Sequence, residues 1–208
     1  MIQVEAFIRF IAFPLLFSGF LQPTTAVSQK HYVPGCVVLT TGDTLVGQVM
    51  DRRETLTGTD LLTKIRFKLE NGGRRRKYRA KQLISYRADG ITYESHPIRS
   101  KGISLLDAYY EIAPSDGDWV FLRVVSRGKL THYQQEWVDE DDSTVESADY
   151  FRKMNESLLV RATQGIFGLK RKNLIEYFQE CTDLSAKIEQ GEFKYPSQVV
   201  DYYNEQCH

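Results

Sequence analysis

The residue types that most often bind metals or act as nucleophiles are sparse in this chain and are not grouped. The four histidines, His31, His96, His132 and His208, share no helical spacing, and no C-x-x-C or H-E-x-x-H motif occurs. The G-x-S-x-G motif of serine hydrolases is also missing. The sequence therefore predicts no metal site and no cofactor, and it assigns no catalytic residue.

An acidic segment at residues 139–147 (DEDDSTVES) could in principle hold calcium through alternate oxygens. An EF-hand loop needs glycine at its sixth position and glutamate at its twelfth, and this segment supplies neither. Its residues also show no apolar period. A solvated acidic loop is therefore expected here.

Charge is distributed unevenly along a chain that is neutral as a whole, with 27 basic and 27 acidic side chains. Residues 52–87 carry 12 basic and 3 acidic side chains, whereas residues 107–150 carry 3 basic and 11 acidic. Overall neutrality argues against a dedicated nucleic-acid binder. The densest basic run follows a predicted turn, so we expect it at an exposed hairpin end. Its basic members are Arg74, Arg75, Arg76, Lys77, Arg79 and Lys81.

Two interpretations of this basic run remain open. It could contact an anionic partner, which for an exported protein means an anionic glycan, lipopolysaccharide or an acidic protein surface. Alternatively, the basic and acidic halves neutralise each other, or the basic side chains keep a sheet edge from aggregating.

The N-terminal residues have the three parts of a secretory signal peptide. A short segment ending in Arg9 precedes an apolar run at 10–21, which is shorter than the roughly 20 residues of a membrane-spanning helix. Ala26 and Ser28 fit cleavage before Gln29. We therefore expect residues 1–28 to be a signal peptide. The mature protein would be periplasmic, associated with the outer envelope or secreted, without a transmembrane segment.

The elements after the signal peptide change from strands to helices. Short alternating segments separated by turn residues predict an antiparallel β-rich region over 29–138, either a meander or a small barrel. Asn71 and Gly72 predict a type I′ turn between two of these strands. Residues 139–168 are expected to hold the acidic loop and one further hairpin.

Residues 169–208 are expected to be helical and to pack on the sheet. Apolar residues recur at three- and four-residue steps from Leu174 to Ile188, which indicates one amphipathic helix ending near Gly191. Pro196 opens a second helix. The expected fold class is α+β, an antiparallel β-rich body followed by two short C-terminal helices.

The three cysteines predict one disulfide. Cys181 lies on the apolar side of the first expected helix and Cys207 on the apolar side of the second. Because the connection between the helices is short, they should run antiparallel and bring these two residues together. Export would place them where thiols are oxidised. Cys36 would remain single as a buried thiol.

Two short motifs stand at the two ends of the chain after the signal peptide. They are Gly42-Asp43-Thr44-Leu45 with Gly47 (a "GDTL-x-G" opening), and Cys181, Leu184, Lys187, Ile188, residues 199–204 and Cys207. Together they resemble an uncharacterised family of secreted proteins from the Bacteroidota, over roughly residues 35–208. The resemblance implies export, a β-rich body and a cysteine-containing helical C-terminus, but no reaction. Cys36 departs from the family, because such proteins favour an aromatic residue at its position.

Polarised charge without a catalytic motif favours a non-enzymatic envelope or secreted module that binds another macromolecule. The alternative is a hydrolase of envelope or extracellular polymers, with its ionisable groups supplied by separate strands. A concave pocket with converging ionisable groups would favour the hydrolase, and an exposed basic sheet rim would favour the binding module.

Overall fold

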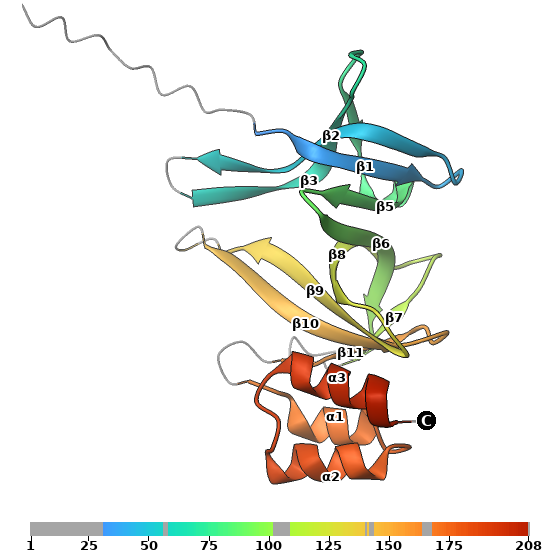
Figure 1. Ribbon diagram of the computed structural model, residues 1–208, viewed down its shortest axis with the longest axis vertical. Helices are drawn as coiled ribbons and strands as arrows, with labels where there is room; N and C mark the ends of the chain where they lie inside the picture. Colours follow the sequence, from blue (N-terminus) through green and yellow to red (C-terminus); the bar gives the residue numbers. More distant parts are fainter. Residues whose placement is uncertain are drawn as a thin grey trace, which may run out of the picture.

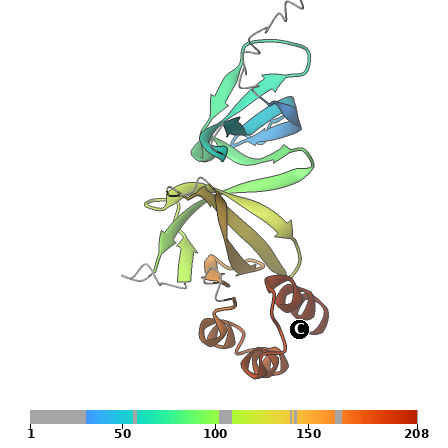
Figure 2. The same ribbon diagram turned by 90° about the vertical axis from the view of Figure 1, so that its left-hand side faces the viewer.

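The structure is a computed structural model that describes residues 31–55, 58–101, 109–139, 141, 144–163 and 168–207. It has three tiers, with a curled β-sheet at one end, a β-barrel in the middle and three helices at the other end (Figures 1 and 2). The predicted class, α+β with an antiparallel β-rich body followed by helices, is confirmed. The signal peptide expected at 1–28 lies outside the described residues.

The first tier is an antiparallel sheet in the order β4-β3-β2-β1-β5-β6. Its apolar side chains alternate with polar ones, as strands with one buried face require. Val37, Phe67 and Tyr86 on the inner face belong to one buried cluster. The elements are β1 Val33–Leu39, β2 Thr44–Thr55, β3 Gly58–Leu69, β4 Arg76–Tyr78, the 3-10 helix η1 Ala80–Gln82, β5 Leu83–Ala88 and β6 Ile91–Ser100.

The type I′ turn is found at a different position from the one predicted. Both central residues of such a turn have positive φ, and this holds for Asp89 (48°) and Gly90 (79°) between β5 and β6. At the predicted site, Gly72 has φ 84° but Asn71 is not among the residues with positive φ. The β3–β4 connection continues through Gly73, at φ 124°, so it is longer than a two-residue turn.

The second tier is a six-stranded barrel in the order β6-β7-β11-β10-β9-β8, closed because β6 also pairs with β8. The first half of β6 pairs with β5, so this strand belongs to both tiers and joins them. The barrel interior is filled by a separate apolar cluster that includes Leu122 and Tyr150. The remaining strands are β7 Tyr109–Ile112, β8 Asp118–Ser126, β9 Leu130–Val138, β10 Val145–Lys153 and β11 Leu158–Arg161.

The strands within residues 139–168, the segment that follows the predicted β-rich region, complete the barrel. The further hairpin expected there is present as β10 and β11, with Asn155 at φ 66° in its turn. β10 begins at Val145, so the last three residues of the predicted acidic loop are part of a strand.

The third tier has three helices where two were expected: α1 Arg171–Tyr177, α2 Thr182–Gln190 and α3 Pro196–Gln206. The expected first helix is divided between Phe178 and Cys181, and α2 ends at Gly191, as predicted.

The apolar period continues across this break because α1 and α2 pack on the same buried cluster beneath the barrel. The hydroxyl of Ser185 donates to the carbonyl oxygens of Phe178 (2.9 Å) and Ile175 (3.3 Å), which satisfies acceptors near the break. Within the described part of the chain, no helix is apolar and long enough to cross a membrane.

Candidate functional site

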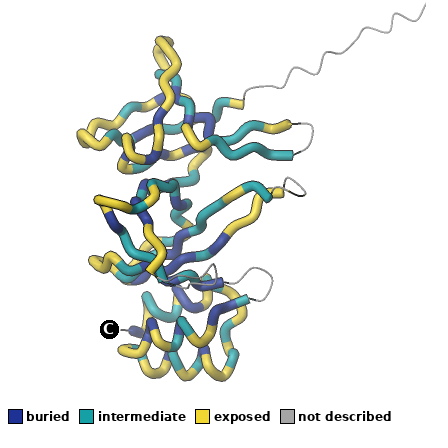
Figure 3. Tube along the Cα trace, turned by 180° about the vertical axis from the view of Figure 1, so that it is seen from behind, coloured by how far each residue is buried: buried dark blue, intermediate teal, exposed yellow. Residues whose placement is uncertain are grey.

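The six basic residues singled out in the sequence form one exposed region, here called the basic surface. Arg74 and Arg75 lie in the β3–β4 connection, Arg76 and Lys77 on β4, and Arg79 and Lys81 on either side of the buried Ala80. All six are exposed, and the β3–β4 connection projects from the first tier (Figure 3).

None of these six side chains forms an ion pair with another described residue. Arg75 lies 5.8 Å from the ring centre of Tyr32, a contact that leaves its charge uncompensated. Acidic groups from 107–150 pair elsewhere: Glu111 and Asp116 with Arg99, and Glu136 with Arg52. The described part of the acidic half therefore does not neutralise the basic surface.

Protection of a sheet edge accounts for part of the basic surface. Among the described strands, β4 pairs only with β3 and is the outermost strand of the first tier, where charged side chains discourage edge-to-edge association. Only Arg76 and Lys77 lie on that strand. The other four residues flank it, so edge protection leaves them unexplained.

The predicted disulfide joins Cys181 to Cys207, with the two Cα atoms 5.7 Å apart. Cys36 is the free cysteine of the described chain. The expectation that it would be buried is wrong, because it is only half-buried on the outer face of β1, opposite the inward-facing Val37.

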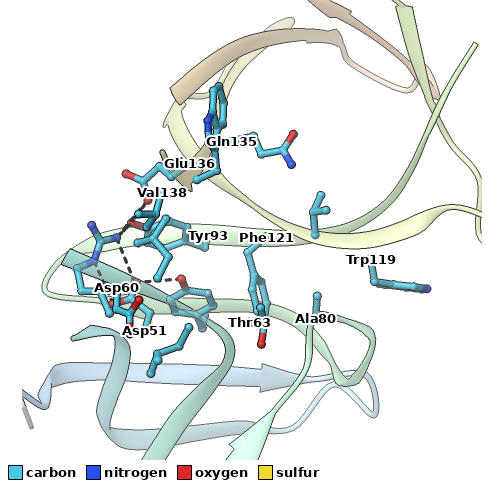
Figure 4. Close-up of a pocket in the computed structure, with 16 residues that line it drawn as sticks. Asp51, Asp60, Thr63, Ala80, Tyr93, Trp119, Phe121, Gln135, Glu136 and Val138 are labelled. Carbon is cyan, nitrogen blue, oxygen red and sulfur yellow. Dashed lines mark hydrogen bonds and ion pairs between the residues drawn. The ribbon is translucent and has the colours of Figure 1, made fainter. Parts of the chain in front are cut away.

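A pocket of about 420 Å³ lies between the first tier and the barrel. Strands β2 and β3 form one side, and β8 and β9 form the other. Figure 4 shows Asp51, Tyr93 and Glu136 at one end of the pocket, Phe121 in its middle and Trp119 at the opposite end. The pocket therefore has a charged end and an aromatic end.

Arg52 organises the charged end. Its Nη2 donates to the hydroxyl oxygen of Tyr93 (2.7 Å) and to Oε2 of Glu136 (3.1 Å), and its Nε lies 3.3 Å from Oδ1 of Asp51. Tyr86 donates to Oδ2 of Asp51 at 3.1 Å, and Tyr93 donates to Oε2 of Glu136 at 3.3 Å. One guanidinium thus holds two carboxylates that lie 85 positions apart in the sequence, one on β2 and the other on β9.

The two tyrosines of this network stay protonated over the physiological range. Burial raises the pKa of Tyr86 well above its usual value, and the neighbouring Asp51 raises it further. Burial likewise raises the pKa of Tyr93, with Glu136 adding to the effect. Both phenols therefore serve as fixed hydrogen-bond donors to carboxylates.

A second cluster on the barrel centres on Glu94 of β6. It accepts hydrogen bonds from Tyr133 (2.6 Å) and Arg127 (2.5 Å), and Nε2 of His96 lies 3.0 Å from it. Burial by itself would raise the pKa of Glu94, but the bonds from these three groups outweigh it and hold the pKa at about 2, below the ordinary value of 4.5.

This shift predicts an acid-dependent loss of stability. Because the pKa of Glu94 is lower in the folded than in the unfolded state, its contribution is complete above about pH 4.5 and is lost as the pH falls towards 2. Glu94→Gln should therefore flatten the stability curve in this acid range. Thermal unfolding against pH would measure it, with exposed Glu189→Gln as the control. Curves of equal steepness for wild type and Glu94→Gln would contradict the assignment.

The three described histidines, His31, His96 and His132, have different surroundings. His132 is buried beside Asp149, with its Nε2 2.7 Å from the carboxylate, whereas His96 belongs to the Glu94 cluster and His31 is exposed. Among the described residues, no group of three or more ligand-type side chains could hold a metal ion.

The sequence identified the basic surface but missed the pocket. The pocket residues are scattered over strands far apart in the chain, and no motif joins them. Even the two tryptophans gave no local signal, because Trp119 pairs with Pro97 of β6 and Trp137 with Glu146 of β10, outside the paired part of β8 and β9.

Comparison with known proteins does not connect either site to an established function. No protein-family model, curated protein or solved structure matches this chain.

Proposed function

We propose that the protein is an exported, non-enzymatic module that binds an anionic glycan of the envelope or its surroundings through the basic surface. The observation that carries the proposal is a set of six exposed basic side chains without ion-pair partners among the described residues. Such a cluster attracts anions over several ångströms and raises their local concentration.

A glycan is favoured over an acidic protein surface because the basic surface lacks an apolar anchor. Protein interfaces generally place aromatic or aliphatic side chains at their centre. No large exposed hydrophobic residue lies within residues 74–81 of the described chain. A polymer that carries repeated acidic groups needs only charges as partners.

Export is part of the proposal and rests on the features of residues 1–28 together with the disulfide. A disulfide between Cys181 and Cys207 is typical of an oxidising compartment. The resemblance to secreted Bacteroidota proteins agrees with export and stays a prediction.

The test replaces Arg74, Arg75 and Arg76 with serine and measures binding to polygalacturonate, a polymer of uronic acids. Each exposed ion pair contributes about 0.2–1 kcal/mol, so losing three should weaken binding about 3- to 150-fold. The melting temperature should change little, since the three side chains are exposed.

The matched control removes three exposed basic side chains from the helical tier, with Arg171, Lys172 and Lys194 replaced by serine. It changes the net charge equally and should leave binding nearly intact. Equal loss in both variants would mean that only net charge matters, and the basic surface would not be the site. Purified lipopolysaccharide in a parallel titration tests that second anionic partner.

The alternative, a hydrolase of envelope polymers, is favoured by the pocket, where Asp51 and Glu136 approach one guanidinium. Both carboxylates are already bound by Arg52 and by a tyrosine hydroxyl, so substrate or water would have to displace these bonds. The test is release of reducing ends from polygalacturonate and from peptidoglycan. Release by the wild type that Glu136→Gln abolishes would establish the hydrolase and displace the binding proposal.

A further inference from the structure

The pocket leaves aromatic rings accessible along its length. The chain contains two tryptophans, and both line this pocket, Trp119 from β8 and Trp137 from β9. Trp137 is 38% exposed, Trp119 and Phe121 are partly exposed, and Phe121 lies between the charged end and Trp119 (Figure 4). Aromatic side chains accessible in a concave site indicate a ligand with apolar faces.

The polar groups beside these rings are positioned for hydroxyl groups. Gln135 accepts a hydrogen bond from Tyr150 at its Oε1, while its amide nitrogen has no partner among the described residues. Thr63 is exposed at the β3 side of the pocket. At the charged end, Arg52 presents N–H donors, and its partners Asp51 and Glu136 present carboxylate acceptors.

The charge of the lining limits the ligand class. The lining carboxylates Asp51, Asp60 and Glu136 are compensated by Arg52 in the lining and by Arg53 and Arg123 beside it. The pocket therefore offers no uncompensated charge to an ionic ligand, and a purely apolar ligand would leave its polar groups unpaired. A ligand with an apolar face and several uncharged hydroxyls meets both requirements.

From this combination we infer that the pocket binds a neutral pyranose ring of a saccharide, stacked on an indole. The C–H face of such a ring packs on aromatic carbon, and its edge hydroxyls bond amide, carboxylate and guanidinium groups. The volume of about 420 Å³ lies within the range of small-molecule sites and accommodates one to two rings.

This inference does not depend on the proposed function, because a neutral saccharide needs no basic surface. The two sites are nonetheless neighbours. Ala80 lines the pocket and lies between Arg79 and Lys81 of the basic surface. A glycan with both neutral and acidic units would therefore reach both sites at once.

The experiment uses tryptophan fluorescence, since both emitters line the pocket. The mature disulfide-bonded protein is titrated with maltotriose, cellotriose and N-acetylated chitotriose, and isothermal calorimetry provides a second readout. A saturable emission change is expected with at least one of the three. Trp137→Ala should weaken that binding about tenfold, the equivalent of roughly 1.4 kcal/mol. Tyr195→Ala removes an exposed aromatic side chain of the helical tier and should leave binding unchanged.

Two results would overturn the inference: no saturable signal in either readout with any of the three saccharides, or equal affinity for wild type and Trp137→Ala. Retention of the native melting temperature by Trp137→Ala shows that a loss of binding is not a loss of folding. The serine variant of Arg74, Arg75 and Arg76 should bind the neutral saccharide normally. This measurement separates the inference from the proposed function, because the triple serine variant is expected to lose only its binding to polygalacturonate.

Discussion

Removal of the Cys181–Cys207 disulfide, by reduction or by a double alanine substitution, is expected to lower the free energy of unfolding by about 3 kcal/mol. The bond closes a loop of 26 residues that contains all of α2 and α3, and opening it returns conformational entropy to the unfolded chain. Urea unfolding of the oxidised and reduced protein would measure the difference.

The third cysteine supplies the control for this prediction. Cys36→Ala removes a half-buried thiol and should change the stability by less than about 1 kcal/mol. If reduction left the unfolding midpoint unchanged, α3 would be held mainly by its other contacts. Those contacts include the burial of Val199 and Val200 in the helical cluster, the two hydrogen bonds between Asn204 and the backbone of Leu130, and the bond from Lys129 to the carbonyl of Cys207.

Arg52→Met is the second substitution with a large expected effect, a loss of about 2 kcal/mol of stability. It leaves two carboxylates, with side chains only 10% (Asp51) and 14% (Glu136) exposed, without their common cation. Removing one partner of a buried pair costs about 3–5 kcal/mol. The value expected for Arg52→Met, about 2 kcal/mol, is smaller because Arg52 is partly exposed. Chemical unfolding would measure it.

The neighbouring arginine is a matched control. Arg53 pairs with Asp60, but both side chains are about half exposed, so Arg53→Met should cost less than about 1 kcal/mol. Glu136→Gln in the Arg52→Met background should recover part of the loss, because it removes one of the two carboxylate charges that lose Arg52. Glu136 would otherwise keep only its longer pair with Arg123, at 3.8 Å. Equal effects of the two arginine substitutions would show that Arg52 does not organise the pocket.

The sequence predicted the features that depend on local patterning. Three local signals have counterparts in the structure. The alternation of polar and apolar residues in 64–69 corresponds to part of β3, and the helix stop at Gly191 corresponds to the end of α2. The apolar helix sides that carry Cys181 and Cys207 correspond to the disulfide. The basic surface was predictable for the same reason, since a dense run of charges cannot be buried.

Two errors show where local patterning is insufficient. The division of the first predicted helix near Phe178 left the apolar period intact, because both halves pack on one cluster and no proline or glycine marks the break. The type I′ turn forms at Asp89-Gly90, where β5 meets β6 directly. At Asn71-Gly72 the added Gly73 lengthens the connection.

The pocket was unpredictable because it exists only after the barrel closes. Asp51 on β2 meets the segment of Glu136 on β9 through Arg52, and this contact depends on β6 being shared by both tiers. Nothing in the separate strands encodes which carboxylate will meet which guanidinium. β7 was not predicted either, because it has only four residues and its pairing with β6 and β11 belongs to the barrel.

Binding of an anionic glycan at the basic surface should be tested by measuring the affinity for polygalacturonate against salt concentration. Between about 0.1 M and 1 M salt the Debye length falls from about 10 Å to 3 Å, so exposed charges are increasingly screened. We expect a steep loss of affinity for the wild-type protein and a shallower one for the triple serine variant. An affinity that does not change with salt, or the same slope for both proteins, would contradict it.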